Sequence, residues 1–306
     1  ELGGVGARDE EVTALPYVSV VVPHYNDLVR LRTCLDALCG QTLPIGSFEI
    51  VVADNASPVE RHALDEVIAG RARLVVVDQR GAGPARNGGV NCARGEILAF
   101  TDCDCVPEPK WLEEGLRALG AGDLVGGAMR VLVDDAGSMT GAEAFELEFA
   151  FDNEQYVKRK SFSVTANLFC RREVFEAVGG FGVGISEDFD WCRRAKALGF
   201  KITYAPSAIV GHPARRNWVE LRHKWARLNR ESFATFAGTP VGRIAWFARS
   251  VALPASAIVH TPRVLLSNKL PRAGDKLAAI RVLYGVRLWR CLDALRLALA
   301  AGGRRR

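Results

Sequence analysis

The amino-acid sequence predicts an α/β protein: a mixed, mainly parallel sheet flanked by helices, with a helical extension at the C-terminal end. Short β-branched runs alternate with helical patterns between residues 17 and 101, an order that favours a parallel sheet. Beyond residue 238 the strand-like runs stop and long basic helical patterns follow. The 306-residue chain is 49% hydrophobic and 25% charged, which excludes a disordered or collagen-like protein.

The first strand and helix have the clearest patterns. Residues 18–22 (VSVVV) are largely β-branched and do not alternate with polar residues, as expected of a strand buried on both faces. The helix that follows is predicted by leucines at spacings of three and four, namely Leu28, Leu31, Leu35 and Leu38. The same pattern then recurs. Strands are expected at residues 48–53, 74–78 and 97–101, and the helices between them end near residues 69 and 93.

Beyond residue 101, strand-like and helical patterns alternate less regularly. Helices are expected at residues 111–119, 142–151, 172–178 and 187–198. Strand-like runs lie at residues 124–133, 162–170, 201–204 and 208–210. Because no linker composition interrupts the chain before residue 238, this half is expected to complete and cover the same sheet. Residues 17–238 are therefore predicted to form one domain.

The two ends of the chain differ from this domain. Residues 1–16 have neither a basic segment nor an apolar core, so they are interpreted as a disordered tail without a signal peptide. Residues 244–259 are apolar but too short to span a membrane, and they contain an arginine and a proline. Residues 276–298 predict an amphipathic helix with a basic border. Together, residues 239–306 are predicted to form a basic amphipathic helical extension.

The net charge of +5 conceals an asymmetry along the chain. Residues 241–306 hold 13 Lys and Arg against only Asp275 and Asp293, a net charge of +11, and the other residues sum to −6. A mildly acidic body with a basic end indicates an anionic partner, either a membrane surface or nucleic acid. The eight cysteines include no Cys-x-x-Cys pair and are interpreted as buried, reduced thiols of a cytosolic protein.

Carboxylates follow the predicted strands at the point where each strand ends. Asp102 and Asp104 come directly after one buried strand, and Asp54 comes after another. In open α/β sheets, ligands bind beyond the carboxyl ends of the strands. Two carboxylates one residue apart repel each other unless a cation lies between them, and Mg²⁺ or Mn²⁺ prefers such oxygen ligands. The alternatives are a solvated turn for the pair and a helix N-cap for Asp54.

Two further motifs combine glycine with charge. Arg86 lies in a glycine-rich segment, GAGPARN, ahead of a helix, where it can bind a phosphate or form a surface salt bridge. Glu187, Asp188 and Asp190 begin a helix after a glycine-rich loop. Acidic residues there compensate the helix dipole, which is the simplest explanation. Crowded carboxylates can also have the raised pKa values that suit a general base.

Two features closer to the C-terminal end each allow two explanations. His212 ends an apolar strand and is either a structural histidine or a further ligand of a metal site. Residues 218–230 form an apolar helical stripe interspersed with arginine and lysine. The stripe is consistent with core packing beneath a solvated basic face, or with contact to a membrane or a lipid phosphate.

Six motifs occur in a specific order along the chain: VSVVVPHYN, FEIVVADNAS, GAGPARNGG, EILAFTDCDC, FGVGISEDFDWCRR and AIVGH. Over roughly residues 17–212 this order resembles family 2 glycosyltransferases with the GT-A, Rossmann-like fold. The resemblance implies which residues hold the nucleotide base and ribose: Pro23, Tyr25, Asn26 and Asp54. It also implies that Arg86 and Asn87 lie close to the nucleotide.

The same resemblance implies the metal and catalytic residues. Asp102 and Asp104 match the D-x-D motif that binds the ribose and the divalent metal on the diphosphate. Glu187 and Asp188 match the catalytic pair whose aspartate is the base. Arg194 matches a basic residue beyond that pair, and His212 lies where some members supply another metal ligand. His24 departs from the family pattern, in which Thr or Val is commoner, and makes the base preference less certain.

The implied activity is an inverting, metal-assisted glycosyl transfer with Mn²⁺ or Mg²⁺ as cofactor. The expected donor is a nucleotide-diphosphate sugar, with a UDP-sugar favoured. The expected acceptor is a hydroxyl of a glycan or of a polyprenyl-diphosphate-linked sugar in cell-surface or exopolysaccharide assembly. One alternative is a sugar nucleotidyltransferase, which would need a basic glycine-rich loop where this chain has PHYND. The other is a non-catalytic nucleotide-sugar-binding scaffold.

The expected location is the cytoplasm, peripheral to the inner face of the plasma membrane. The basic extension would bind anionic lipid, helped by apolar burial of the helix at residues 276–298. Nucleic acid is not expected as a partner, and an oligomer is left open. The competing explanation is that the extension packs on the catalytic domain or on a second subunit.

Overall fold

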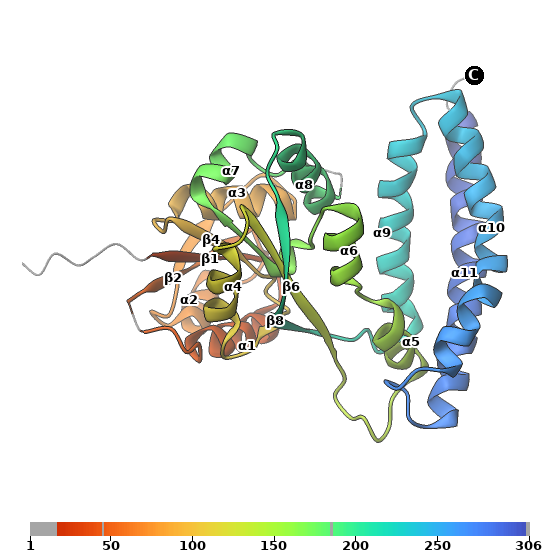
Figure 1. Ribbon diagram of the computed structural model, residues 1–306, viewed down its shortest axis with the longest axis horizontal. Coiled ribbons are helices and arrows are strands. Elements are labelled where there is room, and N and C mark those ends of the chain that lie inside the picture. The colour runs from red at the N-terminus through yellow and green to blue at the C-terminus, as the bar shows by residue number, and fades with distance from the viewer. Residues whose placement is uncertain (1–16, 45, 184–185, 304–306) are drawn as a thin grey trace, which may run out of the picture.

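The structure, a computed structural model, describes residues 17–44, 46–183 and 186–303. A sheet of eight strands lies at its centre with helices around it, and a layer of long helices stands at one side (Figure 1). The strand order is β3-β2-β1-β4-β7-β6-β8-β5. The strands are β1 (Val18–His24), β2 (Phe48–Asp54), β3 (Arg73–Val76), β4 (Ile97–Phe100), β5 (Val106–Pro107), β6 (Leu124–Leu132), β7 (Leu168–Arg171) and β8 (Ile202–Pro213). The predicted tail, residues 1–16, lies outside the described residues.

The three pairings among the first four strands are parallel, as the sequence predicts. Strand β1 lies between β2 and β4, with Val20 opposite Ile50 on one side and Ala99 on the other. All of β1 is buried, which explains why its apolar run does not alternate. Strands β7 and β5 run antiparallel to their neighbours. The predicted mixed, mainly parallel sheet is therefore confirmed.

Two apolar cores cover the two faces of the sheet. One face is covered by α1 (Leu28–Cys39), α2 (Arg61–Ile68) and α4 (Trp111–Leu119), and the other by α3 (Ala82–Cys92), α7 (Arg172–Val178) and α8 (Glu187–Ala197). Leu35 and Trp111 are fully buried in the first core, and Trp191 is fully buried in the second. These helices bury the stripes that the leucine and aromatic spacings predict.

The structure differs from the sequence-based expectations mainly in the second half. Asn153–Lys160 forms a helix, α6, although its sequence NEQYVKRK lacks an apolar stripe; only Asn153 and Val157 are buried. Much of the run expected as a strand at residues 162–170 is loop and a 3₁₀ turn, η1 (Thr165–Asn167), before β7 begins. The two strand candidates at residues 201–210 form one strand, β8, because it continues across a bulge opposite Gly127.

A third apolar core lies in the layer of helices at the side of the sheet (Figure 1). It joins α5 (Gly141–Phe149), α9 (Trp218–Phe236), α10 (Pro240–Leu265) and α11 (Ala273–Gly303). Helix α9 packs on α10 and α11, so the predicted division near residue 238 falls inside this layer and stays a prediction. Among the described residues, none of the helices combines the length and the apolar character needed to cross a bilayer.

Candidate active site

The carboxyl ends of β1 and β2 form the first wall of the site. His24 and Asp54 lie opposite each other in the parallel register, and His24 Nδ1 is 2.8 Å from Asp54 Oδ1. His24 Nε2 accepts the backbone N–H of Asp27 at 3.1 Å, so the ring proton is assigned to Nδ1, which donates to Asp54. Ser57 donates to the same carboxylate through its hydroxyl and its N–H. Asp54 is therefore buried and held in one orientation by three protein hydrogen bonds.

The loop after β1 carries the other residues expected at the nucleotide base. Pro23 is buried in β1, whereas Tyr25 is 50% exposed. Asn26 is exposed, adopts a left-handed φ of 54°, and its N–H donates to Ser57 Oγ at 2.9 Å. This contact ties the β1 loop to the β2 loop. Of these residues, sequence reasoning treated His24 as a departure and did not single out Ser57 as a ligand of Asp54.

Arg86 joins the two acidic motifs of the site. Its side chain is 3% exposed; Nη2 donates to Asp102 Oδ1 at 2.6 Å and Nη1 donates to Glu187 Oε1 at 2.9 Å. The guanidinium also lies over the Phe181 ring, 5.9 Å from its centroid. Burial lowers the pKa of Arg86, but the charges of Asp102 and Glu187 outweigh burial and raise it overall. One buried cation thus fixes the D-x-D loop against the start of α8.

The glycine-rich loop before α8 is held by residues that the resemblance placed near the nucleotide. Asn87 accepts the N–H of Phe181 at 2.8 Å and donates to its carbonyl at 2.9 Å. A Cβ on Gly83 would lie 2.3 Å from the Gly182 carbonyl oxygen, so only glycine allows this approach. Arg194 donates to three acceptors, Asp190 Oδ2 and the carbonyls of Val178 and Gly180. In this structure Asn87 and Arg194 shape the loop, and their predicted contacts to a nucleotide stay predictions.

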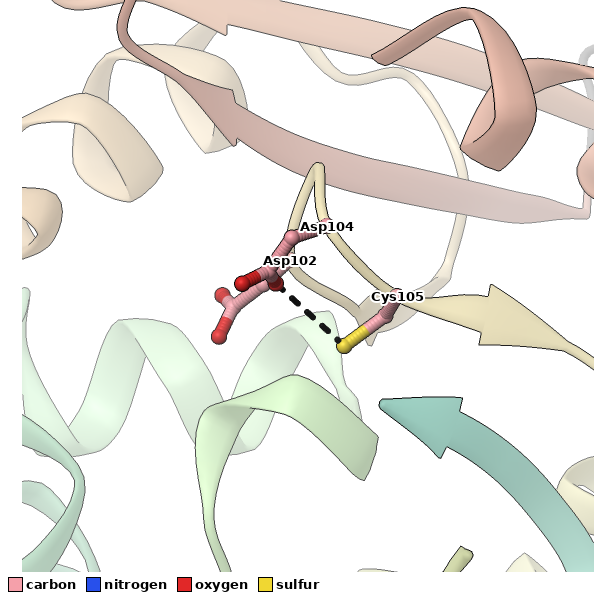
Figure 2. Close-up of side chains that lie close together, drawn as sticks. All are labelled: Asp102, Asp104 and Cys105. Atoms are coloured by element: carbon pink, nitrogen blue, oxygen red, sulfur yellow. Dashed lines mark hydrogen bonds between the residues drawn. The ribbon is translucent and has the colours of Figure 1, made fainter. Parts of the chain in front are cut away.

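The D-x-D motif presents two carboxylates side by side. Asp102 and Asp104 project from the loop between β4 and β5, and Figure 2 shows them beside Cys105. Their side chains are 33% and 30% exposed, and the ligand atoms of the three residues all lie within 4.8 Å of one another. Burial, followed by the charges of Asp104 and Asp102, raises the pKa of Cys105 well above its ordinary value. The protonated thiol therefore donates weakly to Asp104 Oδ1, at 3.7 Å, rather than binding as a thiolate.

His212 completes a donor set around Asp104. Its Nδ1 lies 2.8 Å from the Pro213 carbonyl, which can only accept, so the proton is assigned to Nδ1. Its Nε2 then faces Asp104 Oδ2 at 3.5 Å with a free lone pair. A carboxylate and an imidazole lone pair that face each other need a cation between them or a second proton on the ring. Asp104 and His212 therefore fit a divalent metal of the Mg²⁺ or Mn²⁺ type, and Asp102, the third predicted ligand, lies beside Asp104.

The three acids at the start of α8 have separate partners. Glu187 pairs with Arg86, and Asp190 pairs with Arg193 and Arg194. Asp188 is partly buried and makes no ion pair among the described residues; it accepts only the N–H of Phe189, at 2.7 Å. Burial and then the charge of Glu187 raise its pKa to about 6. Of the three, Asp188 has the environment of a general base that works near neutral pH.

Comparisons with known proteins agree with this architecture. A family model described as Glycosyl transferase family 2 matches residues 19–179. Glycosyltransferase AglE of Haloferax volcanii is 32% identical over 301 residues, which cover 95% of this chain and 96% of AglE. The pre-mycofactocin glycosyltransferase of Mycobacterium tuberculosis is 27% identical over 218 residues, covering 66% of this chain and 44% of that protein.

A similar fold is found in a solved structure, the mannosyltransferase PcManGT of Pyrobaculum calidifontis in complex with GDP-Man and Mn²⁺. The likeness has a TM-score of 0.63 at 19% identity and covers 93% of this chain and 87% of that one. At this identity it supports the GT-A fold alone. The family match extends over more than half of the chain, and the similarity to AglE extends over nearly all of it. The chain is a glycosyltransferase and belongs to glycosyl transferase family 2.

Proposed function

We propose that this enzyme moves a sugar from a nucleotide-diphosphate sugar to a hydroxyl of a glycan or lipid-linked acceptor, with inversion at the anomeric carbon. The observation that carries the proposal is the bridge made by Arg86, which holds Asp102 and Glu187 against one buried guanidinium. The bridge holds Asp102, one of the acids expected to bind the metal, close enough to Asp188, the expected base, for the charge of Asp102 to contribute to the raised pKa of Asp188. A single displacement needs both functions at one site: a group that neutralises the charge on the leaving diphosphate and a group that accepts the proton of the attacking hydroxyl.

The donor would lie across the ends of β1, β2 and β4. Tyr25, Asn26 and the preorganised Asp54 are proposed to contact the base and ribose, and Asp102 the ribose. UDP-sugars are the first donors to test, and the GDP-Man bound to PcManGT supports testing GDP-sugars as well. The PHYND loop argues against a sugar nucleotidyltransferase, since it supplies no basic glycine-rich cradle for a triphosphate.

Each residue of the site has a defined part in the mechanism. A divalent metal held by Asp104 and His212, with Asp102, would stabilise the negative charge that develops on the leaving diphosphate. Asp188 accepts the proton of the acceptor hydroxyl. The hydroxyl oxygen attacks the anomeric carbon from the face opposite the leaving diphosphate. Arg86 holds Asp102 and Glu187 in place through its two ion pairs, so that little reorganisation is needed during the reaction.

Turnover with a panel of nucleotide sugars and Mn²⁺ tests the proposal. Release of a nucleoside diphosphate from at least one donor, with a glycosylated product, is the expected result. Pyrophosphate release from a nucleoside triphosphate and a sugar phosphate would instead identify a nucleotidyltransferase. Binding of a donor without product or diphosphate release, across a range of glycan and prenyl-diphosphate-linked acceptors, would favour the scaffold.

The layer of helices is proposed to rest on an anionic membrane at the inner face of the plasma membrane. Along α10, apolar side chains that are at least half exposed recur on one face: Val241, Ile244, Phe247, Val251, Ile258, Val259 and Leu265. Helix α11 adds exposed Leu277, Leu288 and Leu292. Residues 241–306 also carry most of the excess positive charge, and each Lys or Arg near anionic lipid contributes about 1 kcal/mol.

Co-sedimentation with anionic vesicles tests the location. The full chain is expected to bind vesicles at low salt and to be partly released at high salt. Ile244→Ser with Phe247→Ser should weaken binding severalfold, because both side chains are exposed on α10. Val29→Ser with Leu198→Ser, a matched exposed pair on α1 and at the end of α8, should leave it unchanged. If the full chain does not bind these vesicles at low salt, the membrane proposal fails and the helices have a structural role.

A further inference from the structure

A basic cavity lies directly beside the predicted metal ligands. It has a volume of about 420 Å³ and opens between the end of β8, α9 and the start of α1. Asp104 and His212 form part of its wall. The remaining lining includes one further acid, Glu220, a histidine, His223, and five Arg and Lys side chains: Arg30, Arg215, Lys224, Arg227 and Arg230. Basic side chains therefore outnumber acidic ones in the lining, which also includes two of the predicted metal ligands.

The positive charge of this cavity is only partly compensated by protein carboxylates. Glu146, which is 1% exposed, is shared by Lys224 at 2.7 Å and Arg215 at 3.0 Å, so two cations meet one carboxylate. Arg227 reaches Glu231 only at 3.8 Å. Arg230 makes no ion pair within the part of the chain that the structure describes. The arrangement leaves an excess of positive charge that an anion would neutralise.

The basic wall is built into the fold rather than scattered over the surface. Lys224 is only 10% exposed and lies between the Phe151 and Trp225 rings, 5.5 and 5.7 Å from their centroids. Burial lowers the pKa of Lys224 to about 8, although Glu146 opposes this. A bound anion would favour the charged form of this lysine. The helix α9 that carries it is anchored in the third apolar core through Leu221.

The cavity is lined mainly by elements other than those that supply the proposed donor contacts. Those contacts come from the ends of β1, β2 and β4, whereas all but one of the five Arg and Lys side chains of the cavity come from α9 and from the segment between β8 and α9. The metal that Asp104 and His212 would hold already offsets the charge of the donor diphosphate. A second cationic site next to the metal therefore needs a second anionic ligand, and in this reaction the second ligand is the acceptor.

We infer that the cavity binds a phosphate or diphosphate group of the acceptor, so that the enzyme glycosylates phosphorylated carriers in preference to neutral glycans. The inference rests on the proposed function and specifies its acceptor class. Arg227 and Arg230 at the cavity mouth would bind the phosphate oxygens, and Arg215 and Lys224 would supply charge from the wall.

The test separates the phosphate site from the donor site. The full chain, saturated with Mn²⁺ and whichever of UDP or GDP binds, is titrated by calorimetry with inorganic phosphate, phenyl phosphate and farnesyl phosphate. Binding of the esters is expected, with weakening of about tenfold or more in Arg227→Ala with Arg230→Ala. The matched control, Arg243→Ala with Arg281→Ala, removes the same charge from exposed positions on α10 and α11 and should bind as the wild type does.

Each outcome bears on the inference. Tighter binding of farnesyl phosphate than of phenyl phosphate supports it and identifies a lipid carrier; equal binding supports it with a soluble phosphorylated acceptor. Binding of inorganic phosphate but of neither ester would overturn it, as would equal losses in the control variant. Loss of nucleotide binding in the Arg227 and Arg230 variant would assign the cavity to the donor. Failure of the wild type to bind any nucleotide would instead refute the proposed function, irrespective of the phosphate esters.

Discussion

Replacing Asp188 with asparagine is expected to lower kcat by about 10²–10⁴-fold while donor binding persists. The change is nearly isosteric, but an amide cannot accept the proton of the acceptor hydroxyl. Donor affinity should change little because the donor contacts come from other residues. Initial rates at saturating donor and acceptor, together with calorimetric titration of the donor, measure the two effects separately.

The pH dependence of kcat is a second test of the role of Asp188. Because the pKa of Asp188 is raised to about 6, the base form is lost as the pH falls through that value, and kcat of the wild type should decline below about pH 6. The Asp188→Asn enzyme should lack this acidic limb. Asp190→Asn is the matched control, since Asp190 pairs with Arg193 and Arg194, and it should retain most of the activity. Near-normal turnover by Asp188→Asn would transfer the role of base to Glu187.

Arg86→Ala is expected to remove activity and to cost about 3–5 kcal/mol of folding free energy, the usual effect of breaking a buried ion pair from one side. The substitution leaves Asp102 and Glu187 without the cation that they share. Both carboxylates would then repel each other across the site, and the D-x-D loop would lose its anchor. Denaturant unfolding and turnover measure the two losses.

Arg86→Lys separates charge from geometry. A lysine keeps the positive charge but cannot donate to both carboxylates in the fixed planar fork of arginine. It should recover part of the stability but little of kcat. Arg61→Ala is the control: its pair with Asp65 is exposed, and its loss should cost no more than about 0.5 kcal/mol. An Arg86→Lys enzyme with wild-type kcat would contradict the bridging role.

The parallel half of the sheet could be predicted from the sequence because its strands are buried on both faces. Their unbroken apolar runs and the leucine spacing of α1 leave little choice of structure. The second half could not be predicted as well. Helix α6 depends on its Asp152 cap and on tertiary contacts rather than on an apolar stripe. The two short apolar runs of β8 are joined across a bulge into one strand, and the runs themselves do not indicate this. Local pattern alone contains neither kind of information.

The candidate site was predictable in its residue types but not in its connections. Carboxylates at strand ends point to a metal and a base by chemistry alone. The contacts of Arg86 cannot be read from the sequence, because they join residues 16 and 101 positions away. His24 was an anomaly in the sequence and becomes the residue that orients Asp54. The basic stripe of α9 had a solvated face as its simplest explanation, and only the fold brings it beside Asp104.

The most direct test of the central claim is the metal dependence of nucleotide binding at Asp104. Calorimetric titration of UDP and GDP into the full chain is compared in Mn²⁺ and in EDTA, for the wild type, for Asp104→Ala and for Asp123→Ala as a control outside the site. The account predicts that EDTA and Asp104→Ala each weaken nucleoside-diphosphate binding by about tenfold or more, that EDTA abolishes turnover, and that Asp123→Ala changes neither. Full nucleotide affinity and undiminished turnover in metal-free buffer would contradict it.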